Sequence, residues 1–143
     1  GARGAEAAAY RVQPDLALIL EGTTANDMPE TESHQQVTEV GKGPAISMMD
    51  NGTIVYPQLF RAMKQMAEQQ NIPHQVRRGT NGRTDAGVIH KACAGALAIG
   101  LSVPCRYIHG PVSVASMADF ENTVKLADAF LQARKYEEVK KNV

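Results

Sequence analysis

The stretch DLALILEGTTANDMPE, residues 15–30, decides the fold class of this chain. Its consecutive apolar residues at positions 16–20 are typical of a strand that is covered on both faces of a sheet. Glu21 follows this run directly, and the glycine and threonines behind it predict a sharp turn. In α/β sheets, functional residues commonly lie where the chain leaves the carboxyl end of a strand. Glu21 is therefore a candidate functional residue, although a solvated or ion-paired loop carboxylate is the simpler interpretation of this position alone.

Apolar runs and amphipathic segments alternate along the rest of the chain. This alternation predicts an α/β structure with a mixed or mostly parallel sheet and helices on both of its faces. Strands are predicted at residues 16–20, 36–40, 45–49, 72–79 and 96–103, and helices at residues 5–10 and from Pro57, Asp85 and Ser116 onwards.

The helical periodicity also predicts which side chains face the core. Pro57 is suited to the first turn of a helix, and Ser116 with Asp119 resembles a helix cap. We expect the following side chains to be buried: Leu59, Met63, Met66 and Ala67 in one helix, Val88, Ile89, Ala92 and Cys93 in a short helix capped by Asp85, and Phe120, Val124, Ala127 and Leu131 in the final helix.

Length, charge and cysteine content narrow the class of protein. A chain of 143 residues is long enough for one compact domain with a core. Lys plus Arg and Asp plus Glu each number 15, which favours neither nucleic-acid nor membrane-surface binding. Apolar runs are too short to cross a membrane, and the first ten residues do not resemble a secretory signal. With Cys93 and Cys105 as ordinary thiols, we expect a cytoplasmic protein.

The carboxyl-end rule selects two more places besides Glu21. One is the Gly-rich loop at residues 77–90, and the other is the segment at residues 102–112, which contains His109. Taken singly, each has a simpler interpretation: the glycines belong to turns, and His109 is a hydrogen-bonded loop histidine. The remaining histidines show no metal-ligand spacing. No single motif therefore establishes a site.

Several motifs taken together give a stronger signal. In order along the chain they are RGAEAAAY, LEGTTANDMPE, GKGPAISMMDNG, GRTDAGVIH and VPCRYIHGPVSV followed by ENTVKLADAFL. In this order and spacing, they resemble the second half of an M42-family metalloaminopeptidase, of the glutamyl and tetrahedral aminopeptidase group. The resemblance implies a zinc-peptidase-like fold. It also implies that residues 1–143 are the C-terminal half of the catalytic domain, without the first half and its inserted β-domain.

The resemblance also implies an activity and a site. Members of this family remove N-terminal residues from peptides with two divalent metal ions, zinc or cobalt, held by histidines and carboxylates. A metal pair of this kind activates a water molecule near neutral pH. The residues that match the family pattern are Glu21 and His109 as metal ligands, Thr84 and Asp85 near the substrate, and Thr23, Thr24 and Arg106 as residues that orient the ligands.

The chain departs from the family pattern at its start. The glutamate pair that supplies the general base and a further ligand is expected just before Gly1, so no catalytic residue is assigned here. We expect the isolated chain to be inactive, with the missing N-terminal half of the same protein as its partner, a peptide as the substrate of the whole enzyme, and a homo-oligomer such as the dodecamer of relatives. One alternative is a non-catalytic remnant that acts as an assembly module. A third possibility, a glycoside hydrolase, requires a carboxylate pair that nothing marks.

Overall fold

A mixed sheet with helices on both faces forms the framework of the protein. The computed structural model describes residues 2–141, so Gly1, which marks the expected position of the glutamate pair, lies outside the described residues. The strand order is β1-β4-β2-β3, with β5 paired to the end of β4. Along the chain the elements are α1 (Arg3–Val12), β1 (Leu16–Thr24), η1 (Ser33–Gln35), β2 (Ala45–Ile46), α2 (Pro57–Gln69), β3 (Gln75–Val76), α3 (Ala86–Ile89), β4 (Leu97–Arg106), β5 (Val114–Ala115), α4 (Met117–Ala133) and α5 (Tyr136–Lys140).

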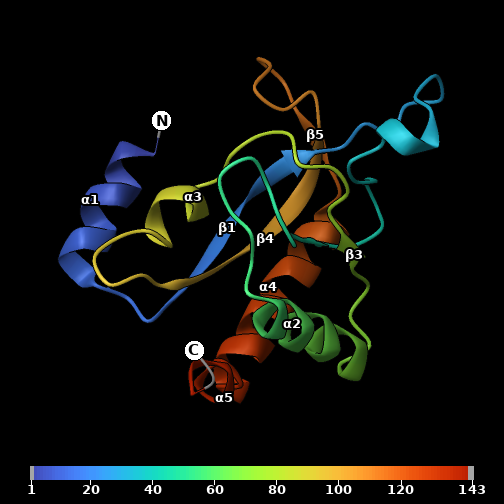
Figure 1. Cartoon of the computed structure of the whole chain (residues 1–143). Helices are drawn as coiled ribbons and strands as arrows, with labels where there is room; N and C mark the ends of the chain where they lie inside the picture. Colours follow the sequence, from blue (N-terminus) through green and yellow to red (C-terminus); the bar gives the residue numbers. More distant parts are fainter. Residues whose placement is uncertain (1, 142–143) are drawn as a thin grey trace.

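Strands β1 and β4 are the two long strands of the described sheet, with β1 at its edge. They run parallel, with Leu16 opposite Leu97 and Thr24 opposite Cys105, so both strands reach the same edge. Figure 1 shows α1 and α3 on one side of these strands and α2, α4 and α5 on the other. Each face has its own apolar cluster, a small one around Ile19 and Ala98 beside α3 and a larger one around Ile99 and the helices opposite. The predicted α/β class with helices on both faces is confirmed.

Helix α2 follows its sequence pattern closely. Pro57 stands in the first turn, where its missing N–H costs no intrahelical hydrogen bond. The predicted core positions Leu59, Met63, Met66 and Ala67 are all buried. They pack into the larger cluster with Ile46, Leu126 and Phe130.

Helix α4 begins as predicted, but of its four predicted core positions only Ala127 is buried. The Ser116 hydroxyl accepts a hydrogen bond from the Asp119 amide, which is the expected cap. The buried side chains are Asp119, Thr123, Leu126, Ala127 and Phe130, whereas Phe120, Val124 and Leu131 are exposed. Apolar residues occupy more than one side of α4, and the core takes the side that includes Leu126 and Phe130.

The buried Asp119 carboxylate links α4 to the loop before β2. Its oxygens accept hydrogen bonds from the amides of Gly41 and Gly43 at 2.7 and 2.8 Å. Both glycines have positive φ, and a Cβ on Gly43 would lie 2.1 Å from the Pro73 carbonyl oxygen. The GKG sequence therefore provides a backbone conformation in which two amides converge on one carboxylate.

The predicted strand at residues 36–40 was wrong. Residues 36–40 follow the short helix η1 as a segment that belongs to no strand of the described sheet. The Gln75 side chain bonds to both the amide and the carbonyl of Glu39, at 2.9 Å each, and to the Gly43 carbonyl. A side-chain amide thus satisfies backbone groups that a neighbouring strand would otherwise bind.

Other boundaries differ from the predictions in ways that bear on the site. Strand β1 continues to Thr24, so Glu21 lies within the strand and the expected turn begins later. The predicted strands at residues 45–49 and 72–79 shorten to β2 and β3. Helix α3 ends at Ile89; Asp85 precedes it without a side-chain cap, and Cys93 is exposed. None of the helices within residues 2–141 is both long and apolar enough to cross a membrane.

Candidate metal and substrate site

Glu21 lies on the face of β1 that carries α1 and α3. Side chains alternate along a strand, so Glu21 shares this face with Ile19 and Thr23. Its partner across the β1–β4 ladder is Ser102. The carboxylate is half-buried and lines an open cavity of about 1190 Å³, whose wall also includes Glu6 of α1, Ala2 just before it, and the loops before α2 and α3.

The environment of Glu21 disfavours its charged form. Burial, and after it the charges of Asp85 and Asp50, raise the pKa of this carboxyl to about 7, although Arg77 acts in the opposite direction. Carboxylates gathered at one wall of a cavity leave a local excess of negative charge. A bound cation at this position would compensate that charge.

Asp50 is a member of this group that the sequence reasoning missed. It is buried, and its carboxylate accepts hydrogen bonds from the Gly52 amide at 2.7 Å and the Thr84 hydroxyl at 2.9 Å. The bond to Thr84 fastens the loop before α2 to the loop before α3, and both line the cavity. The only sequence signal was its place in MMDNG, shortly after a predicted strand.

Thr84 and Asp85, the predicted substrate residues, both line the cavity beside Glu21. The Thr84 hydroxyl is engaged with Asp50, whereas the exposed Asp85 contributes charge to the wall. A free carboxylate in this position attracts cationic groups such as the ammonium of a peptide N-terminus. The structure brings these predicted residues together with Glu21.

Thr23 and Thr24, the predicted orienting residues, differ in their surroundings. The buried Thr23 hydroxyl accepts a hydrogen bond from Arg77 Nε at 3.1 Å. The same guanidinium donates to the carbonyls of Gly79 and Asn81, so Arg77 joins β1 to the Gly-rich loop. Thr24 points to the opposite face of β1, and its carbonyl accepts from the Thr38 hydroxyl. Neither threonine is hydrogen-bonded to Glu21 within the described part of the chain.

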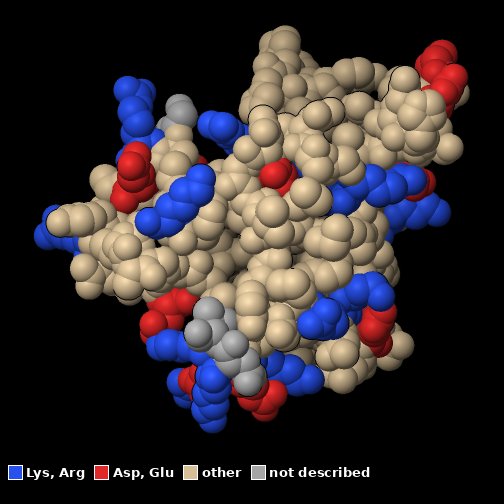
Figure 2. Space-filling view, viewed as in Figure 1, with Lys and Arg blue, Asp and Glu red and all other residues tan. Residues whose placement is uncertain are grey.

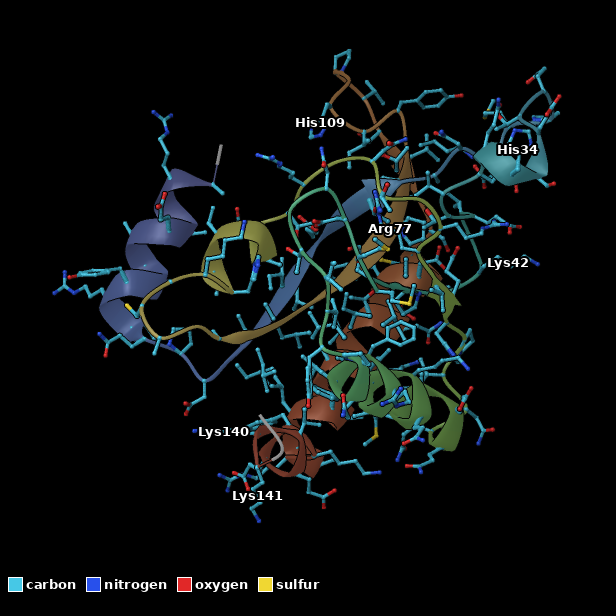
Figure 3. All side chains as sticks on the ribbon, in the orientation of Figure 1. His34, Lys42, Arg77, His109, Lys140 and Lys141 are labelled. Carbon is cyan, nitrogen blue, oxygen red and sulfur yellow. The ribbon has the colours of Figure 1, made fainter. Side chains whose placement is uncertain are left out.

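His109 lies in the loop that follows β4, above the carboxyl ends of β1 and β4 (Figure 3). The loop folds back onto β1, because a Cβ on Gly22 would lie 3.5 Å from Ile108 Cδ1. His109 is exposed and has a positive φ of 68°, as Tyr107 has one of 58°. His34, by contrast, sits on η1 well away from this edge (Figure 3). The fold thus places His109 over the end of the sheet where Glu21 lies.

Arg106, predicted to orient the ligands, binds a residue that the sequence reasoning did not select. Its Nε and Nη2 atoms donate to the Asp27 carboxylate at 2.6 and 2.8 Å. The Val40 amide donates to the same carboxylate at 2.9 Å. These bonds, chiefly those from Arg106, lower the pKa of Asp27 to about 2. Arg106 therefore ties the end of β4 to the loop after β1, rather than contacting Glu21 directly.

The donor atoms suit zinc or cobalt, which accept imidazole nitrogen and carboxylate oxygen. The carboxylates of Asp50 and Asp85 near Glu21 also favour a cation there. However, residues 2–141 contain no group of three or more His, Cys, Asp or Glu side chains that could hold a metal ion. Glu21 and His109 therefore fit as part of a ligand set and not as a whole one.

The surface charge does not suggest a large charged partner. Lys and Arg are interspersed with Asp and Glu around the face seen in Figure 2, and the middle of that face is largely uncharged. This view agrees with the equal numbers of basic and acidic residues in the sequence. A small-molecule or peptide ligand in the cavity fits this surface better than a polyanion.

Comparison with protein families gives one match over most of the chain. A family model described as M42 glutamyl aminopeptidase matches residues 1–126. A putative aminopeptidase from Acetivibrio thermocellus is 39% identical over 126 residues, which are 88% of this chain and 38% of that protein. The chain thus spans well under half the length of this relative.

Solved structures give the same result. The aminopeptidase APDkam598 from Desulfurococcus kamchatkensis superposes with a TM-score of 0.88 and 37% identity, over 91% of this chain and 37% of that one. The TET1 peptidase of Pyrococcus horikoshii, whose description says that it assembles into a tetrahedron or a large octahedral shell, superposes with a TM-score of 0.74 and 32% identity. That match covers 90% of this chain and 36% of the TET1 chain.

Proposed function

This chain belongs to the M42 glutamyl aminopeptidase family, and from that premise we propose that it supplies one wall of the active site of a metal-dependent aminopeptidase. The proposed substrate is the N-terminal residue of a peptide. The observation that carries the proposal is the half-buried Glu21 carboxylate, whose pKa is raised by burial and by the neighbouring carboxylates of Asp85 and Asp50, at the sheet edge that His109 overlies.

Glu21 and His109 are the proposed metal ligands of this chain. Strand β1 holds Glu21 in a fixed direction, because Glu21 lies inside the ladder with β4 rather than in a mobile turn. A divalent metal bound there, zinc or cobalt, would activate a water molecule for attack on the scissile carbonyl. Because two protein ligands do not complete a four-coordinate site, the remaining ligands have to come from other polypeptide.

Asp50, Thr84 and Asp85 are proposed to bind the substrate's N-terminal end. Thr84 and Asp50 hold each other through a 2.9 Å hydrogen bond, which gives that wall of the cavity a defined shape. Asp85 carries an exposed carboxylate beside Glu21 and can pair with the substrate ammonium. Such pairing positions the scissile bond near the metal ligands.

The proposed partner is the remainder of an M42 catalytic domain. Ala2 and Glu6 line the cavity, so polypeptide that precedes them in relatives would adjoin the same cavity. This agrees with the glutamate pair expected just before Gly1. The outer edge of β1 also has no strand partner among residues 2–141, which leaves backbone groups for another strand. Assembly into a homo-oligomer, as described for the TET1 peptidase, is part of this proposal.

A chimeric enzyme tests the proposal. Residues 1–143 replace the matching segment of the Desulfurococcus kamchatkensis aminopeptidase, and hydrolysis of aminoacyl-4-nitroanilides is measured with added Co²⁺. We expect turnover that a chelator abolishes, and none from the 143-residue chain alone. Glu21→Gln and His109→Asn should each remove the activity, whereas Glu39→Gln, a change at an exposed ion pair, should keep it. A folded chimera that is inactive, or one in which Glu21→Gln retains full turnover, would contradict the proposal.

A further inference from the structure

We propose that Asp27 is a positioning residue for His109: through Arg106 it holds the loop after β4 in the conformation that presents the imidazole over the sheet edge. The inference rests on the proposed function for the role of His109 as a metal ligand. Its geometric part, the dependence of the loop on Asp27, can be tested without any metal.

The contacts between the loops after β1 and β4 continue where the strands end. The Ala25 amide donates to the Cys105 carbonyl at 2.9 Å, just beyond the last ladder pair. Next along the chain comes the pair of Asp27 and Arg106, followed by the Tyr107 hydroxyl, which lies 3.8 Å from Met28 Sδ. The segments that carry Glu21 and His109 are thus joined side by side past the end of the sheet.

The Asp27–Arg106 contact is the most directional link in this series. Both oxygens of Asp27 receive a guanidinium N–H, and only 9% of the Asp27 side chain is exposed, against 34% of Arg106. A two-bond contact fixes the orientation of the guanidinium as well as its position. The Val40 amide holds the Asp27 carboxylate from the other side, so Asp27 is itself a fixed point.

The backbone between Arg106 and His109 needs such an anchor. Tyr107 and His109 both adopt left-handed φ values of 58° and 68°, which non-glycine residues rarely take without support from their surroundings. The Gly110 amide and the Ser113 hydroxyl both bond to the Tyr107 carbonyl and close the turn on itself. These bonds shape the turn internally, whereas Arg106 attaches it to the sheet edge.

The test compares Asp27→Asn and Arg106→Lys with Glu39→Gln. Arg106→Lys keeps the charge and removes the two-bond geometry, and it serves if Asp27→Asn fails to fold. Glu39→Gln removes an exposed ion pair of similar length, 2.9 Å to Arg78, next to Val40 in the chain but without a bond from its side chain to Asp27 or Arg106. Amide hydrogen exchange is followed at Ala25 and Gly110, which are bonded in this region, and at Met63 in the buried part of α2.

We expect exchange at Ala25 and Gly110 to accelerate about tenfold or more in Asp27→Asn and Arg106→Lys, because a charge-assisted bond is lost. Exchange at Met63 should change much less, and Glu39→Gln should leave all three amides unchanged. Equal acceleration at Met63 would show a merely structural role and overturn the proposal. So would unchanged exchange at Ala25 and Gly110 in both variants.

Manganese broadening supplies the functional readout. In the wild-type chain, low concentrations of Mn²⁺ should broaden the NMR signals of the His109 ring before those of His34, an exposed histidine 3.3 Å from Glu32. In Asp27→Asn and Arg106→Lys the Mn²⁺ concentration that broadens His109 should rise about tenfold or more, with His34 unchanged. An unchanged Mn²⁺ concentration in both variants overturns the positioning role. Equal broadening of both histidines in the wild type instead contradicts the metal assignment, and the exchange result then still decides whether Asp27 holds the loop.

Discussion

Helices α2 and α4 lie on the same face of the sheet, yet α2 hides its large apolar side chains and α4 leaves many of its own in contact with solvent. In α2, Leu59 and Met63 are fully buried. In α4, Phe130 is fully buried while Phe120 is 54% exposed. The two phenylalanines of α4 therefore lie on different sides of the helix. We call the side with Phe130, which packs in the core, the closed side, and the side with Phe120, which contacts solvent, the open side.

The open side of α4 faces a groove rather than empty surface. Phe120 and Val124 form one wall of a space of about 560 Å³, and Leu20 and Val103 of the sheet form the other. Elements of this chain therefore enclose the apolar side chains of α2, whereas Phe120 and Val124 of α4 stay exposed in the groove. The groove lies beside β1, whose outer edge has no strand partner among residues 2–141.

The largest expected effect tests the two phenylalanines of α4 against each other. Phe130→Ala removes a fully buried ring from the larger core cluster and should lower the free energy of unfolding by about 3–5 kcal/mol. Phe120→Ala should change it by no more than about 0.5 kcal/mol, because the ring is already exposed. Urea unfolding of both variants measures the difference. Similar losses from the two substitutions would remove the distinction between the closed and open sides.

A second prediction concerns Asp119, the buried carboxylate on the closed side of α4. Asp119→Ala leaves the amides of Gly41 and Gly43 without their acceptor and should cost about 2–4 kcal/mol of unfolding free energy. Asp128→Ala, at an exposed position of the same helix, should cost about 0.5 kcal/mol or less. Thermal unfolding of the pair measures both values. If both variants melt at the same temperature, the GKG loop does not depend on Asp119.

The third prediction is a pH dependence at the loops beyond the carboxyl ends of β1 and β4, where Arg106 binds Asp27. The folded-state pKa of Asp27 is about 2, below its ordinary value of 3.8, because Arg106 stabilises the carboxylate. Its contribution to stability is therefore present above about pH 4 and is lost as the pH falls towards 2. Asp27→Asn should flatten the loss of stability in this range, as measured by unfolding at several pH values. Glu39→Gln is the control, and an unchanged acid profile in Asp27→Asn would contradict the assignment.

The smallest effect on stability is expected in the groove. Val124→Ser on the exposed face of α4 should leave the free energy of unfolding within about 0.5 kcal/mol of the wild type. It should still reduce self-association, because the groove presents less apolar surface to a second molecule. Light scattering over a range of concentrations measures this. A marked loss of stability would instead indicate that Val124 belongs to the core.

The local sequence pattern was enough to predict features that depend on residues close together in the chain. The buried face of α2 and the cap of α4 follow from residues within a few turns of each other, and both were predicted correctly. The strand at residues 36–40 was not, because the distant Gln75 side chain and the Arg78 amide bind its backbone groups in place of a neighbouring strand. The end of β1 was placed too early, since its length is set by pairing with β4.

The candidate site likewise contains residues that the sequence identified and residues that only the fold revealed. Glu21, Thr84, Asp85 and His109 were selected from motifs in the sequence, and the fold places the first three around one cavity. Asp50 and Asp27 lie in the quoted motifs but were not selected, because a motif does not show that their carboxylates bond to Thr84 and Arg106 far along the chain. A contact between two segments that are far apart in the chain leaves no recognisable pattern in the sequence of either segment.

What the sequence by itself determined is the alternation of elements, the family, and the types of residue available for chemistry, since these depend on periodicity and on motifs in order. Only the tertiary structure decided which side of α4 is buried, how far β1 extends, and that Asp27 joins Arg106. The physical reason is that burial, strand pairing and pKa depend on contacts between residues that lie far apart in the sequence. The residues next to each of them in the chain do not show which contacts form.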